Sequence, residues 1–187
     1  MKFYIILALI SPLFGDLIPQ RVFNLYQNGN YHEACQIGFS KIPQYRANES
    51  FITLVGFSCL KDDKIDQLGA FLPHLNQTAD ARTNNAFFSM ILMQKTLLMQ
   101  SIYDQKPIKN LRFPSSSHPL SKIFVMYMQD PQNHTNLKEY RDPATPRQHY
   151  KLYPIEVQGR KSIALDEYYD NILTVHHVYQ DKGLRYG

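Results

Sequence analysis

The sequence predicts a mainly α-helical protein with antiparallel helical hairpins in its N-terminal half and an irregular α(+β) C-terminal half. Apolar residues recur at helical spacing up to about residue 103. The pattern repeats at an offset of about 34 residues, the length that two antiparallel helices and their turns require. Seven prolines follow Lys106 and interrupt any long helix there.

The composition is that of a folded, globular chain. Of its 187 residues, 44% are hydrophobic and 13% aromatic, far from the composition of disordered chains. The net charge is +4, but the basic residues are scattered singly and form no run that could follow a phosphate backbone. We therefore expect no nucleic-acid partner.

The first residues have the layout of a secretory signal peptide. Lys2 precedes the apolar stretch 3–10, and the small residue Gly15 stands at a suitable cleavage position. The apolar stretch is too short to cross a bilayer core, which needs roughly 20 residues. We expect export and cleavage near Gly15, with an uncleaved anchor or a buried first helix as the alternative. The expected organisation is a signal peptide at 1–15, a helical domain at 16–105 and a Pro- and Tyr-rich region at 106–187.

Export would favour a disulfide between the two cysteines, Cys35 and Cys59, because disulfides persist in oxidising compartments. In the chain-entropy model the closed loop would contribute about 3 to 4 kcal/mol. We predict this disulfide, and two buried free thiols remain the alternative.

The helices of the first half have recognisable ends. Asn28-Gly29-Asn30 breaks the first helix, since Gly and Asn adopt left-handed backbone angles readily. Asn30 can cap the second helix together with Glu33, in a variant of the capping box. Asn48 can start a third helix, and the turn 61–63 precedes a fourth helix that carries Ile65, Leu68 and Phe71 to Pro73. Thr78 can cap a long helix over Ala79–Tyr103.

Self-alignment at the repeat offset identifies the expected turn and packing positions. The residues concerned are Leu25, Gly29, Tyr31, Ala34, Gly56, Ile65 and Leu68. The first copy, with Leu25, Gly29-Asn30-Tyr31 and Ala34, resembles the tetratricopeptide repeat (TPR) family. The second copy departs from the pattern, with Asp63 in place of Gly. The resemblance implies stacked helices that hold a protein partner. In export signal, size and repeat type, the chain is also similar to small periplasmic proteins of Gram-negative bacteria that brace machines such as the flagellar motor.

The sequence of the second half predicts shorter helices and strands. We expect a short helix over 120–128, a linker over 131–148, a strand over 150–157 and a turn at Gly159-Arg160. The run 166–181 fits both a helix and a strand. The acidic pair at its start and Lys182-Gly183 at its end favour the helix.

No pattern of catalytic or metal-ligating residues emerges from the sequence. His176 and His177 are adjacent, so their side chains diverge on a helix and face opposite sides on a strand. His32 and Cys35 suit packing between helices as well as they suit a reactive thiol beside a base. The loop that ends in His118 lacks the Gly-x-Ser-x-Gly motif of a serine nucleophile. We expect neither a metal nor a cofactor.

The sequence therefore predicts a non-enzymatic periplasmic adaptor of a cell-envelope assembly, with a flagellar motor accessory component as one such role. Its expected partners are other envelope proteins, with only indirect membrane contact and no small-molecule substrate. The alternative is an envelope hydrolase or metal-dependent enzyme that uses His118, His149, His176 or His177. A ligand-binding protein would need a pocket between the two halves.

Overall fold

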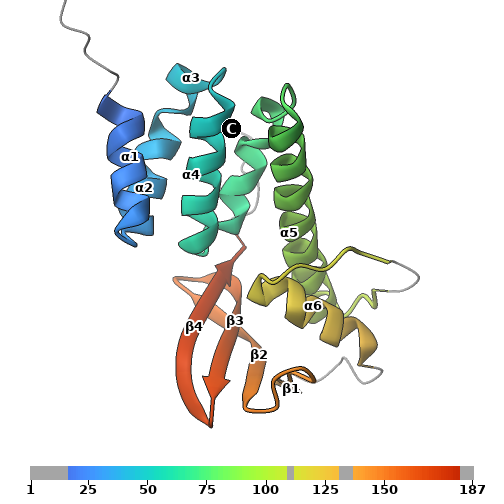
Figure 1. Cartoon of the computed structure of the whole chain (residues 1–187). Coiled ribbons are helices and arrows are strands. Elements are labelled where there is room, and N and C mark those ends of the chain that lie inside the picture. The colour runs from blue at the N-terminus through green and yellow to red at the C-terminus, as the bar shows by residue number, and fades with distance from the viewer. Residues whose placement is uncertain (1–16, 109–111, 131–136, 182–187) are drawn as a thin grey trace, which may run out of the picture.

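The structure, a computed structural model, describes residues 17–108, 112–130 and 137–181 and shows an α+β fold (Figure 1). Its elements in chain order are α1 (Leu17–Gln27), α2 (Tyr31–Ser40), α3 (Ile42–Tyr45), α4 (Glu49–Lys61), the 3-10 helices η1 (Ile65–Ala70) and η2 (Leu72–His74), α5 (Ala79–Tyr103), α6 (Pro119–Gln129), β1 (Lys138–Arg141), β2 (Gln148–Val157), β3 (Arg160–Tyr169) and β4 (Ile172–Gln180).

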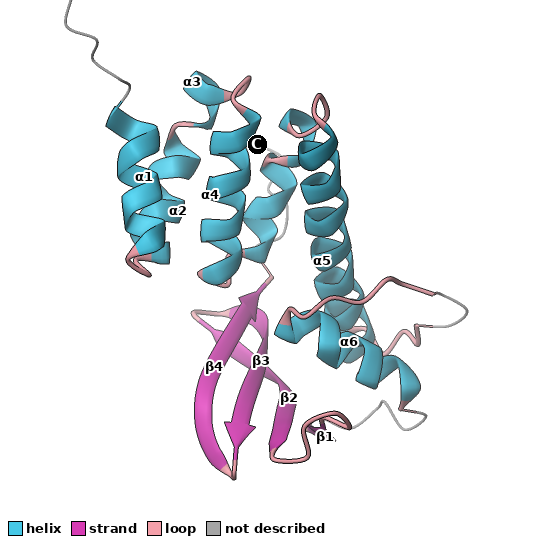
Figure 2. Cartoon of the chain, in the orientation of Figure 1, coloured by secondary structure: helices cyan, strands magenta, loops and turns pink. Residues whose placement is uncertain are grey.

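The helices and strands form two adjoining parts (Figure 2). The helical part, residues 17–103, places α1, α4 and α5 side by side. The four strands form one antiparallel sheet in the order β1-β2-β3-β4. The C-terminal end of β4 approaches the helical part, while the hairpin that joins β3 to β4 points away from it (Figure 1).

Most of the predicted helix ends are confirmed. Gly29 adopts a φ of 76° between α1 and α2. The side chain of Asn48 accepts a hydrogen bond from Phe51 N, and that of Thr78 accepts one from Ala81 N. The capping box predicted at Asn30 is wrong, because its side chain makes no cap hydrogen bond although α2 begins directly after it.

The mainly α fold class is wrong, because residues 138–180 contribute a complete four-stranded sheet. The repeated helical hairpins are incomplete as well. The fourth helix expected between Ile65 and Pro73 consists instead of the short 3-10 helices η1 and η2. The segment expected to be a linker contains β1.

The helix favoured over 166–181 is also wrong, since this run contains the end of β3 and all of β4. Asp170 and Asn171 take φ angles of 51° and 64° and form the two-residue turn of a hairpin. Two consecutive left-handed residues match the right-handed twist of the flanking strands, and Asp and Asn tolerate that conformation. The strand predicted over 150–157 is confirmed by β2, and the next turn centres on Gln158 and Gly159.

One cluster of buried side chains joins the helical part to the sheet. From the helical part it includes Ile91 and Leu98, and from the sheet Leu152 and Leu165. The predicted disulfide between Cys35 and Cys59 is present within this cluster, with a Cα–Cα distance of 4.7 Å. It links α2 covalently to α4.

The positions selected by the repeat alignment occupy different environments. Ala34, Ile65 and Leu68 are buried, whereas Leu25 and Tyr31 are half-buried. Gly56 lies directly beneath the ring of Phe88, which is itself fully buried. The absence of a side chain at Gly56 therefore sets how closely α4 and α5 approach.

Gly56→Ala should destabilise the protein. The added Cβ would lie 2.5 Å from Phe88 Cε2, so the buried ring must shift, and we expect a net loss of about 1 to 2 kcal/mol in the free energy of unfolding despite the better helix propensity of Ala. Urea unfolding with the disulfide intact measures the change.

Gly69→Ala is the matched control, because its Cβ would meet its nearest neighbour, Leu92, at an ordinary 3.5 Å. Its free energy of unfolding should stay within about 1 kcal/mol of the wild-type value. Equal stability of the two variants would contradict the close packing described at Gly56.

Candidate functional site

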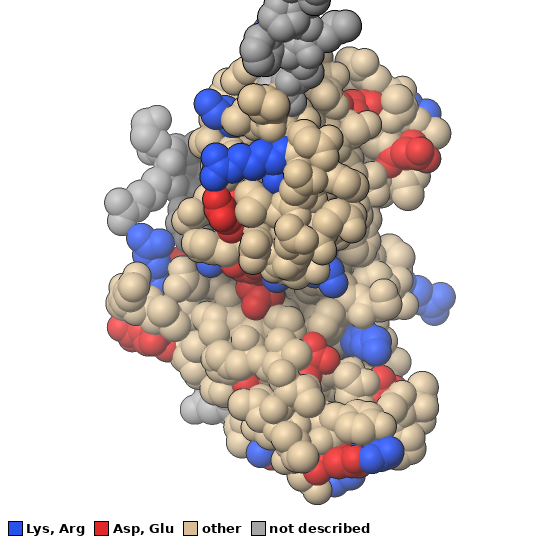
Figure 3. Space-filling model, turned by 60° about the vertical axis from the view of Figure 1, so that its left-hand side comes forward, with Lys and Arg blue, Asp and Glu red and all other residues tan. Residues whose placement is uncertain are grey.

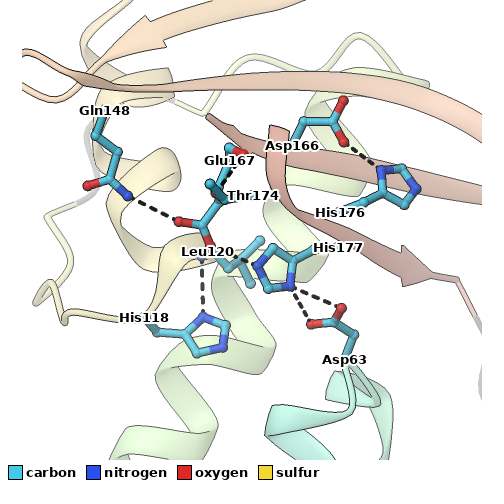
Figure 4. Close-up of polar contacts among 9 residues, drawn as sticks. All are labelled: Asp63, His118, Leu120, Gln148, Asp166, Glu167, Thr174, His176 and His177. Atoms are coloured by element: carbon cyan, nitrogen blue, oxygen red, sulfur yellow. Dashed lines mark hydrogen bonds and ion pairs between the residues drawn. The ribbon is translucent and has the colours of Figure 1, made fainter. Parts of the chain in front are cut away.

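An ionic cluster joins the helical part to the sheet around His177 (Figure 4). His177 Nδ1 lies 2.9 Å and 3.0 Å from the two carboxylate oxygens of Asp63, in the turn after α4. His177 Nε2 lies 2.9 Å from Oε1 of Glu167 on β3. We call these three residues the junction cluster.

Local structure places the members of the junction cluster. Asp63 adopts a φ of 56° in the turn between α4 and η1, and its side chain reaches His177 on β4. On the sheet, His177 pairs with Leu165, and Glu167 follows two residues later on β3. Because side chains alternate along a strand, Leu165, Glu167 and His177 share the face that packs toward the helices.

Its surroundings keep His177 positively charged. Burial opposes the charge, but hydrogen bonds and charge attraction from Asp63 and Glu167 outweigh burial and raise the His177 pKa to about 9. Both ring nitrogens donate to carboxylates, so neither has a lone pair available for a proton or a metal ion. Gln148 Nε2 donates to the other oxygen of Glu167 at 3.2 Å and holds that carboxylate in place.

His118 is held in the opposite charge state. It caps the N-terminus of α6, where its Nδ1 accepts a hydrogen bond from Leu120 N at 3.3 Å. Burial, followed by repulsion from His177 and Lys61, lowers the His118 pKa to about 4, although Glu167 pulls in the other direction. His118 is therefore neutral at pH 7 and serves as a capping acceptor.

The other two histidines of the sheet lie on its opposite face. His176 Nδ1 contacts Asp166 Oδ1 at 2.5 Å, and Tyr153 donates its hydroxyl proton to Asp166 Oδ2 at 3.0 Å. His149 stacks on Tyr168 with the ring centroids 4.7 Å apart. The four histidines of the enzyme alternative therefore do not converge on one site, and within the described ranges no group of three His, Cys, Asp or Glu side chains is arranged so that it could hold a metal ion.

Tyr103, at the end of α5, provides a second tie between helices and sheet. Its hydroxyl accepts a hydrogen bond from Ser162 N at 3.1 Å and lies 2.7 Å from Ile155 O and 2.6 Å from Ser162 O. A helix-borne hydroxyl thus bonds the backbones of both β2 and β3.

Two hollows lie outside the junction cluster. A groove of about 500 Å³ between α1 and α4 is lined by Phe23, Tyr26, Leu54 and Phe57 among others, and none of its lining residues is charged. A wider cavity of about 1160 Å³ lies where η1 and α5 meet the sheet. Its rim carries three basic and three acidic residues, so it shows no preference for one sign of ligand charge: Lys95, Arg160, Lys161, Asp66, Asp104 and Asp181.

Sequence reasoning missed the junction cluster. Asp63 and His177 are 114 residues apart, and no spacing rule connects them. Glu167 is visible as a possible partner of one histidine at helical spacing, but its actual contact with His177 arises from the pairing of β3 with β4, which the expected helix does not contain.

Two structural features bear on the compartment in which the protein folds. A buried disulfide is typical of proteins that fold in an oxidising environment. Within the described ranges, no helix is both long and apolar enough to cross a membrane. The signal peptide predicted at 1–15 lies outside the described residues.

His177→Gln should change how stability depends on pH. The folded-state pKa of about 9 exceeds the ordinary value of 6.5, so this contribution is fully present below pH 6.5 and is lost as the pH rises through 9. Between pH 6.5 and 9.5 the free energy of unfolding of the wild type should fall by on the order of 1 to 2 kcal/mol more than that of the variant. This value allows for solvent screening at the half-buried site.

Urea unfolding at several pH values measures this difference, with His32→Gln as the control. His32 also contacts a carboxylate, Asp62, but its side chain is 61% exposed, so it should contribute little. If wild type and His177→Gln showed the same pH dependence, the ionic role of His177 would be disproved.

In comparisons with known proteins, no protein-family model, curated protein or solved structure matches the chain.

Proposed function

We propose that this protein is a non-enzymatic adaptor that acts in the periplasm as part of a cell-envelope assembly. The observation that carries the proposal is the uncharged, aromatic groove between α1 and α4. The buried disulfide supports the compartment, since it requires oxidising conditions to persist.

The chemistry of the groove suits an apolar protein segment. Phe23, Tyr26 and Phe57 contribute aromatic surface, and Phe23 remains 46% exposed at the rim. Aromatic side chains supply large contact area at low entropic cost and are enriched at protein interfaces. The absence of basic residues from the groove disfavours a nucleic-acid partner, which would need phosphate contacts.

The groove is also held in a fixed shape. Val22 on α1 and Ile52 on α4 are fully buried in the core cluster that both helices share, and the disulfide anchors α4 to α2. A preformed surface loses less conformational entropy when it binds, so more of the contact energy appears as affinity.

The contacts of His177 and His118 disfavour these two residues as general bases in the hydrolase alternative. Both nitrogens of His177 are engaged by carboxylates, and Nδ1 of His118 accepts the capping hydrogen bond. A general base needs a free lone pair within reach of its substrate, and these two contacts occupy the lone pairs that would be required.

Site-specific photocrosslinking in cells that naturally produce the protein tests the proposal. A photoreactive residue at Phe23 should give a discrete adduct with one envelope protein. The same residue at Gln36, which is exposed on α2 away from the groove, is the control and should not give that adduct.

Thr53→Asp places a charge in the groove and should abolish the adduct while leaving the melting temperature within a few degrees of wild type. With the purified partner, Phe23→Ser should weaken binding at least tenfold, about 1.4 kcal/mol. Equal adducts from Phe23 and Gln36, or an adduct insensitive to Thr53→Asp, would contradict the groove as the binding site.

A further inference from the structure

The last strand of the sheet, β4, has an open edge. The sheet order places β4 outermost, and within the described residues it pairs with β3 alone. It spans 9 residues, longer than the typical strand of about 5 to 6. An outer strand presents unpaired N–H and C=O groups along its free side.

The two edges of the sheet differ in their protection against pairing. At the other edge, β1 is only 4 residues long and has the sequence KEYR, so it is short and charged. The β4 sequence, ILTVHHVYQ, contains no Lys, Arg, Asp, Glu or Pro. Short length, charge and proline are the usual means by which proteins prevent edge-to-edge association. β4 has none of these three features, and its pairing with β3 is irregular only at Thr174, close to the hairpin.

The β4 edge also exposes large apolar side chains near its N-terminal end. Ile172 is 69% exposed, Leu173 51% and Val175 42%. In Figure 3, where the side of the molecule that carries β4 comes forward, uncharged residues predominate over the sheet part of this face. Exposed apolar residues beside an open strand edge indicate a surface that is covered in the working assembly.

The backbone register identifies the groups that face outward. Asp181 N donates to Lys161 O at 2.9 Å, so Asp181 directs its N–H toward β3. Because this direction alternates along a strand, His177 and Tyr179 also face β3, whereas His176 and Val178 present their N–H and C=O groups to the free edge.

We propose that β4 pairs antiparallel with β4 of a second copy of this chain, around a two-fold axis near His176. Around this axis, Val175 of one copy lies opposite His177 of the other, and the regular pairing extends as far as Thr174, where the register of β4 with β3 shifts. The strand contains no Lys, Arg, Asp or Glu, and the pair on the axis is His176 with His176, each of which contacts Asp166 of its own copy.

Self-pairing also accounts for the exposed apolar end. In one copy, the C-terminal end of β4 lies against the helical part and its N-terminal end points away (Figure 1). Antiparallel pairing therefore brings Ile172 and Leu173 of each copy beside the helical part of the other. The same surface patch serves both copies, as a two-fold dimer requires.

The proposal goes beyond the adaptor function. A dimer would join two four-stranded sheets into one continuous sheet and would display two α1–α4 grooves. An adaptor with two equivalent grooves can hold two copies of its partner and gains avidity where both sites are engaged.

Sedimentation of the disulfide-intact protein over a range of concentrations tests the dimer. Wild type should approach twice the mass of its monomer, which is below the 21.8 kDa of the full chain once the expected signal peptide is removed. Leu173→Lys places a charge at the β4 edge and should raise the dimer dissociation constant at least tenfold. Leu137→Lys is the matched control, because Leu137 has the same 51% exposure but precedes β1, and it should leave the constant unchanged.

Val178→Pro provides a second disruption that does not depend on charge. It removes an N–H that faces the free edge while retaining the hydrogen bonds to β3, and proline is tolerated on edge strands. This variant should be monomeric and still melt cooperatively. A wild-type protein that stays monomeric at about 1 mM, or a dimer unaffected by both Leu173→Lys and Val178→Pro, would overturn the proposal.

Discussion

The arrangement of this molecule depends on one charged histidine held between two carboxylates. His177 belongs to the sheet, Asp63 belongs to the helical part, and Glu167 completes the cluster from the neighbouring strand. A buried charge that loses one partner is strongly destabilising, so the three side chains fix one another's positions. The hydroxyl of Tyr103 adds a second tie at the end of α5. The sheet is thereby held in one orientation against the helices, and the α1–α4 groove and the β4 edge keep a defined relation.

This constraint also explains the roles of the histidines. Asp63 and Glu167 keep His177 charged, whereas burial and repulsion from His177 and Lys61 keep His118 neutral, and both side chains are occupied by structural hydrogen bonds. Strongly shifted pKa values often mark catalytic sites, but structural ion pairs shift pKa values too. The α1–α4 groove shares no lining residue with this cluster, and the exposed apolar residues of β4 lie toward the end of the strand that precedes His177.

Local chemistry was sufficient to predict much of the helical part. The caps at Asn48 and Thr78, the turn at Gly29 and the pairing of Cys35 with Cys59 each follow from residue types and spacing. The C-terminal helix prediction is wrong because charges at the ends of a segment favour a helix only weakly, whereas Asp170 and Asn171 form a hairpin turn. The 3-10 helices lie in a segment whose apolar spacing fits an α-helix equally well.

The candidate site could not be predicted in the same way. Asp63 and His177 meet only because the sheet returns to the end of α4 after 114 residues, and no local pattern encodes such a contact. The open edge of β4 has the same origin. An uncharged strand is visible in the sequence, but the strand order that leaves it outermost is a property of the whole sheet.

Native-state hydrogen exchange at pH 7 tests most directly whether the junction cluster makes the helices and the sheet unfold as one cooperative unit. The slowest amides of α4 and of β3 should exchange with the same opening free energy, and Asp63→Asn should lower the value for β3 as well as for α4. Opening free energies for α4 and β3 that differ by more than about 2 kcal/mol in the wild type would contradict this coupling.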